Sequence, residues 1–216
     1  MSTQTPTGVV AGHNLVSCIG ELSLQDFDDL TDCTRLATRS ADLTQNRFAN
    51  SNYWLDEYVR TLMFLGWSLH DSVITTRTRS TLTGSVADFL VQRAKTMEDP
   101  RQGNAMIDTL DALKADTPAA LSLDQESLRG RRFQVAPSRY DTRGNLHMAV
   151  FYLELVADTQ KSGFLFWPWE KQSATLVQQS AFLKLNRAEL DTKRELMANK
   201  LRDQVMKRFA LRRRQP

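Results

Sequence analysis

The sequence predicts an α+β protein, in which an N-terminal helical part packs on a C-terminal antiparallel, meander-like sheet followed by a long C-terminal helix. Up to about residue 118, apolar side chains mostly recur at the three- and four-residue spacing of helices. Beyond residue 130 they alternate or form short runs, as strands do. Helices first and strands second is the element order of an α+β protein. We expect one domain, 1–216, with a possible helical lobe at 21–118 and a sheet-plus-helix lobe at 130–212.

The composition is that of an ordinary globular protein, with 216 residues, 41% of them apolar and 25% charged. A chain of this length needs neither a metal nor a disulfide to stay folded. Its only cysteines, Cys18 and Cys33, are therefore expected to be buried thiols. No apolar run approaches the roughly 20 residues of a membrane-spanning helix, and the start has no signal-peptide pattern. We expect synthesis in the cytoplasm, and release by a route that needs no cleaved signal stays open.

The N-terminal half begins with an ambiguous segment. Residues 1–20 fit either a flexible arm or a strand that joins the sheet late. Ser23, followed three residues later by Asp26, predicts the start of a helix. A second helix opens at residues 50–52, is apolar over most of its surface, and ends at Gly66, a typical C-cap. We expect this to be the central core helix.

The next elements are a strand over residues 67–79, helices near 84–97 and 104–114, and an exposed connection at 116–130. Pro137 follows the alternating Phe133 and Val135, which predicts an edge strand because proline cannot donate to the ladder. Residues 147–157 are apolar on both faces in their middle and predict a central strand. Further strands are expected at 164–169 and 175–185. The last helix begins at Asn186 with the apolar stripe Leu190, Met197, Leu201, Val205 and Phe209.

The motifs of common catalytic sites are absent from the sequence. There is no phosphate-binding glycine loop, no dinucleotide fingerprint and no nucleophile elbow. His13, His70 and His147 are isolated, so none has the close ligand spacing of a zinc site. His147 is expected to be a core or cross-strand residue. We therefore predict no catalytic residue, no metal and no cofactor, although a site assembled from distant residues stays open as a third hypothesis.

Acidic residues gather at the start of the first helix. They are expected to serve as its cap and solvated face rather than as a cation site, because acidic side chains complement the positive end of the helix dipole. These residues are Asp26, Asp28, Asp29 and Asp32.

Two features are candidates for binding. The segment 164–169 holds four aromatic side chains in six residues, and an exposed patch of this kind usually marks an interaction site. The end of the chain is basic, since residues 184–216 contain eleven Lys or Arg and four Asp or Glu, a net charge of +7 in a chain of net charge +3. The predicted contact residues are Phe164, Phe166, Trp167, Trp169, Arg208, Arg212, Arg213 and Arg214.

The leading hypothesis from the sequence is a non-catalytic interaction or assembly protein. Its aromatic segment and basic C-terminus would bind a protein partner or a second copy of the chain, since aromatics and Arg dominate contact energies. The alternative is a membrane-active, toxin-like protein that engages acidic lipid, because strands 146–157 and 175–185 are long enough to cross a bilayer as a hairpin. Nucleic-acid binding would rest on charge alone.

Overall fold

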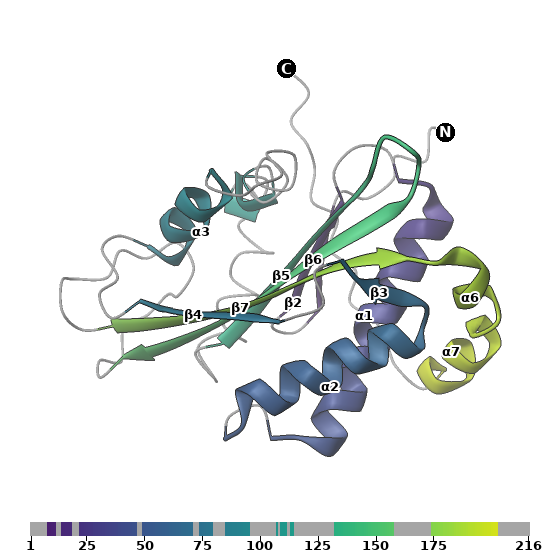
Figure 1. Ribbon diagram of the computed structural model, residues 1–216, viewed down its shortest axis with the longest axis horizontal. Helices are drawn as coiled ribbons and strands as arrows, with labels where there is room; N and C mark the ends of the chain where they lie inside the picture. The colour runs from purple at the N-terminus through teal and green to yellow at the C-terminus, as the bar shows by residue number, and fades with distance from the viewer. Residues whose placement is uncertain are drawn as a thin grey trace.

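The computed structural model describes residues 8–11, 14–18, 22–46, 49–70, 74–79, 85–95, 107, 109–111, 113–114, 132–157 and 174–202. A central sheet carries helices α1 and α2 on one face and α3 on the other, while α6 and α7 follow the end of β7 (Figure 1). The predicted α+β class is confirmed. The helices are α1 (Leu24–Thr44), α2 (Ser51–Phe64), α3 (Val86–Ala94), α6 (Arg187–Asp191) and α7 (Arg194–Leu201). The strands are β1 (Gly8–Ala11), β2 (Asn14–Cys18), β3 (Trp67–Leu69), β4 (Thr75–Arg79), β5 (Arg132–Tyr140), β6 (Leu146–Ala157) and β7 (Ala174–Leu185).

The sheet has the strand order β1-β2-β5-β6-β7-β3, and β4 also pairs with β7. Strands β5, β6 and β7 form the antiparallel meander that the sequence predicts, with β6 in the interior. Strand β2 pairs with β5 in the parallel direction, so the sheet is mixed. Residues 8–11 and 14–18 thus contribute strands to the sheet, which supports the strand alternative for these residues.

Two predictions about strands are wrong. Strand β5 is not an edge, because it lies between β2 and β6. Its pairing with β6 runs to Val135 opposite Phe151 and resumes at Ser138 opposite Met148, so the interruption beside Pro137 is accommodated inside the sheet. Residues 67–79 do not form one strand either. Leu69 and Thr75 are six residues apart, but their partners on β7, Leu183 and Ser180, are only three residues apart. This mismatch splits the segment into β3 and β4.

The prediction of one long C-terminal helix is also wrong. Asn186 caps a helix as expected, accepting from the backbone N–H of Glu189. However, the N–H groups of Thr192 and Lys193 donate to the carbonyls of Glu189 and Leu190, three residues back, and this tight turn ends α6 before α7 begins. The predicted stripe is buried at Leu190, Met197 and Leu201, while Val205 and Phe209 lie outside the described residues.

The predicted helix ends are confirmed. Ser23 Oγ accepts from the backbone N–H of Asp26 at 3.1 Å and starts α1. Gly66 follows α2 with a φ of +94°. A side chain there would also meet backbone atoms of Asn186 and Leu190 at 3.0 Å, so Gly66 allows α2 to end against the start of α6. Helix α3 and the helical residues 107, 109–111 and 113–114 match the two further predicted helices.

Helix α2 is the core helix that its composition predicts. Its Trp54 ring lies 5.4 Å from Tyr58 and 5.3 Å from Tyr152 of β6, centroid to centroid. All three side chains are buried. The α1–α2 layer therefore packs tightly onto the middle of the sheet.

Candidate functional site

The contact residues that the sequence predicts lie outside the part of the chain that the structure describes. They belong to segments 158–173 and 203–216, so they stay predictions. They are Phe164, Phe166, Trp167, Trp169, Arg208, Arg212, Arg213 and Arg214.

A row of polar side chains crosses the sheet beneath α1 and α2. Asn14 of β2 lies opposite Gln134 of β5, Gln134 opposite Tyr152 of β6, and Tyr152 opposite Gln179 of β7. Residues opposite one another on adjacent strands share a face of the sheet. All four are buried, with exposed fractions of 4% or less. We call these four residues the polar row.

The polar row contacts the helix layer through polar groups. Asn14 Nδ2 donates to Thr38 Oγ1 of α1 at 3.0 Å, and Gln179 Nε2 donates to Asn52 Oδ1 of α2 at 2.6 Å. Burial raises the pKa of Tyr58 on α2, and the adjacent Gln134 amide offsets part of that rise. The helices are thus joined to the sheet by polar contacts as well as by apolar packing.

These polar contacts are incomplete. Neither polar atom of the Gln134 amide makes a hydrogen bond of normal geometry within the described part of the chain, and Asn14 Oδ1 lacks one as well. A buried polar group without its hydrogen bond costs about 1–3 kcal/mol. The α1–α2 layer is therefore held to the sheet less strongly than apolar residues of similar volume would hold it.

The strand beneath this interface is apolar on both faces. On the α1–α2 side, Met148 and Val150 of β6 belong to the main core. On the other side, Phe151 and Leu153 are buried, and Phe151 packs edge-on against Phe182 at 6.0 Å between centroids. Removing either helix layer would expose a long apolar strand surface.

A second interface fixes α6 and α7 to the start of α1. The buried Asp26 carboxylate accepts from both Arg187 Nη atoms, from Tyr140 Oη and from Ser23 Oγ. Burial alone would raise the pKa of Asp26, but hydrogen bonds from Arg187, Tyr140 and Ser23 outweigh it and lower that pKa.

Asp29 forms a similar buried pair one turn further along α1. Its carboxylate accepts from both Nη atoms of Arg194 on α7. The sequence predicted that Asp26 and Asp29 belong to a solvated helix face, but both are buried. The short helices α6 and α7 fold back over the start of α1 and bury both carboxylates against arginine.

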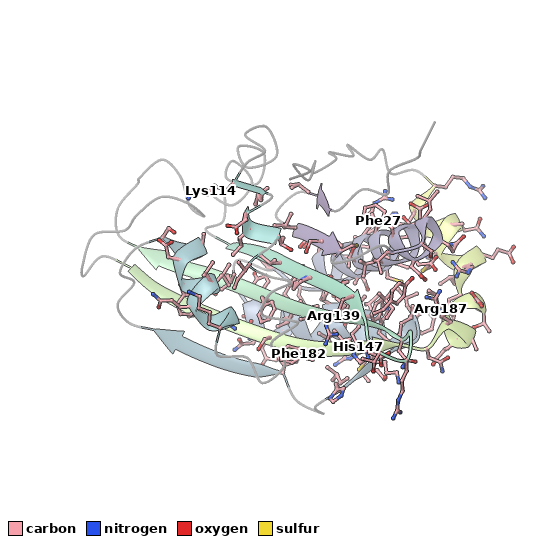
Figure 2. All side chains as sticks on the ribbon, turned by 90° about the horizontal axis from the view of Figure 1, so that it is seen from above. Phe27, Lys114, Arg139, His147, Phe182 and Arg187 are labelled. Carbon is pink, nitrogen blue, oxygen red and sulfur yellow. The ribbon has the colours of Figure 1, made fainter. Side chains whose placement is uncertain are left out.

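His147 lies beside the turn between β5 and β6. Its Nε2 is 3.2 Å from Asp141 Oδ2, and its ring centroid is 6.2 Å from that of His70. Desolvation lowers the pKa of His147, and the Asp141 carboxylate offsets part of this. Arg139 and Lys184 are its cross-strand neighbours, and Figure 2 shows Arg139 and His147 on the same side of the sheet. His147 is thus a cross-strand residue, as predicted.

The thiols do not suit nucleophilic chemistry. Cys18 and Cys33 are both free and buried. Burial raises the pKa of each thiol to about 12, so the reactive thiolate is scarce at neutral pH. Among the described residues, no group of three His, Cys, Asp or Glu side chains could hold a metal ion. None of the described helices combines the length and the apolar composition of a membrane span.

The polar row could have been suspected, but not assembled, from the sequence. Gln179 stands between Val177 and Ala181 at the alternating positions of its strand, where a buried face calls for apolar residues. An isolated glutamine of this kind is the sequence signal that points to a buried polar residue on a strand. The alignment of the four residues into one row depends on the register of four strands, one of which lies more than 100 residues from the others in the sequence.

No protein family and no curated protein matches this sequence. The solved structures that match this chain include the following two. One is titled a delta-endotoxin, with 11% identity, a TM-score of 0.50, and coverage of 82% of this chain and 84% of that one. The other is titled the Evf virulence factor, with 11% identity, a TM-score of 0.46, and coverage of 94% and 84%. At 11% identity, the similarity to the delta-endotoxin structure concerns the fold alone. We conclude that this chain resembles that structure in fold.

Proposed function

We propose that this protein is membrane-active and toxin-like, and that its β6–β7 hairpin engages lipid after the α1–α2 layer leaves the sheet. The observation that carries the proposal is the polar row, buried with unpaired amide atoms between this layer and a largely apolar sheet face. It weakens the contact between helices and sheet without weakening the backbone pairing of the strands. The likeness in fold to a protein titled a delta-endotoxin is compatible with this proposal.

The dimensions of the hairpin suit a bilayer. Strands β6 and β7 each contain 12 residues. At about 3.4 Å per residue each extends roughly 40 Å, more than the roughly 30 Å of the hydrocarbon core. Their pairing runs from His147 opposite Lys184 to Ala157 opposite Ala174. The hairpin would therefore carry much of its own backbone hydrogen bonding into lipid, where unpaired groups are very costly.

A reversible crosslink between layer and sheet tests the proposal. Asn14 Nδ2 and Thr38 Oγ1 are 3.0 Å apart, so Asn14→Cys with Thr38→Cys places two thiols across the interface. Thiol counting measures the crosslinked fraction. We expect the oxidised protein to release dye from liposomes at least tenfold more slowly than the same protein after reduction.

The opposite face of the sheet supplies a matched control. Ser17 Oγ and Thr109 Oγ1 are 2.5 Å apart, and Ser17→Cys with Thr109→Cys would join β2 to a helical residue on that face. This crosslink should leave dye release unchanged. The proposal fails if the unmodified protein releases no dye from anionic or neutral liposomes between pH 4 and 8, or if the Asn14–Thr38 crosslink has no effect.

The second candidate is the interaction or assembly protein that the sequence favours. Its support is the concentration of aromatic and basic residues in segments 164–169 and 203–216. Trp167→Ala with Trp169→Ala, followed by native mass spectrometry, tests it. We expect the variant to lose an oligomer or a bound partner protein. An unchanged assembly state in a folded variant would reject this candidate.

A further inference from the structure

Large apolar side chains are exposed where α2 ends beside α7. Met63 and Phe64 of α2 are 45% and 52% exposed, and Leu196 of α7 is 41% exposed. The Lys193 ammonium lies 4.6 Å from the centroid of the Phe64 ring and joins the two helices at this corner. Figure 1 shows α7 next to the C-terminal end of α2.

One flank of α7 continues this surface with cations. Lys193, Leu196 and Lys200 are spaced three and four residues apart, so they share one side of the helix. Met197 and Leu201 are buried on the adjoining side of the helix. We call Met63, Phe64, Lys193, Leu196 and Lys200 the corner patch.

The corner patch is held in place by the fold beneath it. Arg39 of α1 donates to the carbonyl oxygen of Lys200 at 2.6 Å, which fixes the last turn of α7. Arg187 and Arg194 are bound to Asp26 and Asp29, and Arg202 donates to Asn199 Oδ1, so the lysines supply the cations of the corner patch. Glu195 is exposed too, but it lies two residues from Lys193 and points to a different side of α7.

The geometry points to the corner patch as the docking surface for an anionic bilayer, an inference that rests on the proposed function. Phe64, Met63 and Leu196 would enter the boundary between headgroups and acyl chains. Lys193 and Lys200 would lie at the level of the lipid phosphates, their stems alongside the apolar residues. In the sequence, the segment 184–216, to which α7 belongs, has a net charge of +7.

Docking would come before opening of the helix layer. The corner patch belongs to α2 and α7 as they stand in the closed fold, and it requires no separation from the sheet. The protein with the Asn14–Thr38 crosslink should therefore still bind anionic vesicles while failing to release dye. Binding and leakage are thus two separate readouts, one for the patch and one for the proposed function.

Sedimentation with vesicles tests the patch. Phosphatidylcholine vesicles with about 30% phosphatidylserine are compared with phosphatidylcholine alone, since anionic lipid attracts juxtaposed lysines. Lys193→Gln with Lys200→Gln should weaken binding to the anionic vesicles roughly 30-fold, from the usual contribution of two lysines near an anionic surface. Met63→Ser with Phe64→Ser should weaken it about tenfold or more, because buried apolar area is lost.

Tyr53→Ser with Leu43→Ser is the matched control. Tyr53 and Leu43 are 64% and 77% exposed. Tyr53 lies ten residues before Met63 on α2 and about 15 Å from it. The control should bind like the unmodified protein, and circular dichroism verifies that every variant folds.

Each outcome has a distinct meaning. If the unmodified protein releases dye and the corner-patch variants bind vesicles as well as the control does, the inference is wrong while the proposed function stands. If the variants change the oligomeric state in native mass spectrometry but not vesicle binding, the patch is a protein interface and the inference is again wrong. If the unmodified protein neither binds nor permeabilises anionic vesicles, both fail.

Discussion

Replacing the unpaired amide of the polar row should make the protein more stable and less active. The perturbation is Gln134→Leu together with Tyr58→Phe, which removes the buried amide and the hydroxyl that faces it. Both residues are fully buried, and all three of their side-chain polar atoms lack a hydrogen bond of normal geometry. Replacing such groups with apolar ones of similar shape removes their desolvation penalty.

The magnitude follows from the number of unpaired groups. One such group costs about 1–3 kcal/mol, and the contact between Gln134 and Tyr58 already recovers part of this. We therefore expect the free energy of unfolding to rise by about 1–3 kcal/mol, and Tm by roughly 2–4 °C for each kcal/mol. If the α1–α2 layer must leave the sheet, the same free energy lowers the open population about 5- to 150-fold.

Urea unfolding, thermal unfolding and dye release from liposomes together measure both effects. The matched control is Gln178→Leu, because Gln178 is also buried with an unpaired Oε1 but neighbours Gln179 on β7 and so faces the other side of the sheet. It should stabilise the protein without slowing dye release. A loss of stability in Gln134→Leu with Tyr58→Phe would refute the idea that these groups weaken the closed fold. Higher stability with undiminished dye release would refute the separation of the layer.

Two further predictions concern buried ionisable groups. Asp26→Asn should lower the free energy of unfolding at pH 7 by about 2–3 kcal/mol, less than for a fully buried ion pair because the Arg187 side chain is 46% exposed. Because the folded-state pKa of Asp26 is lowered, its contribution is present at neutral pH and lost as the pH falls below about 4, so the variant should lose less stability between pH 5 and 3. Urea unfolding at these pH values checks this, and an unchanged acid dependence would contradict it. Cys18 and Cys33 should react with a disulfide thiol reagent only after denaturation, since burial raises the pKa of both thiols to about 12. Rapid labelling of either thiol in the native protein at pH 7 would contradict this prediction, because it would show that the thiol is accessible to the reagent.

Local patterns in the sequence were sufficient to predict several elements. Ser23 starts α1 and Gly66 follows α2, because capping depends on side-chain and backbone groups within a few residues. Strands β6 and β7 are also recognisable, because alternation and apolar runs report the faces that a strand buries. From these elements the α+β class follows.

Contacts distant in sequence overturned the other predictions. Pro137 predicts an edge strand, but the pairing of β2 with β5 places it inside the sheet. The apolar stripe from Leu190 onward predicts one helix, but the chain turns at Thr192, and Arg187 and Arg194 reach the buried Asp26 and Asp29.

By itself the sequence determined the class of the protein, the caps of its first helices and the apolar character of its central strands, since each is a matter of nearest neighbours along the chain. Only the tertiary structure decided the polar row and the corner patch. Asn14, Gln134, Tyr152 and Gln179 become neighbours through strand register, and Phe64 meets Lys193 through the fold of α7. A one-residue slip in register would turn each side chain to the opposite face, and the sequence contains no local signal of that register.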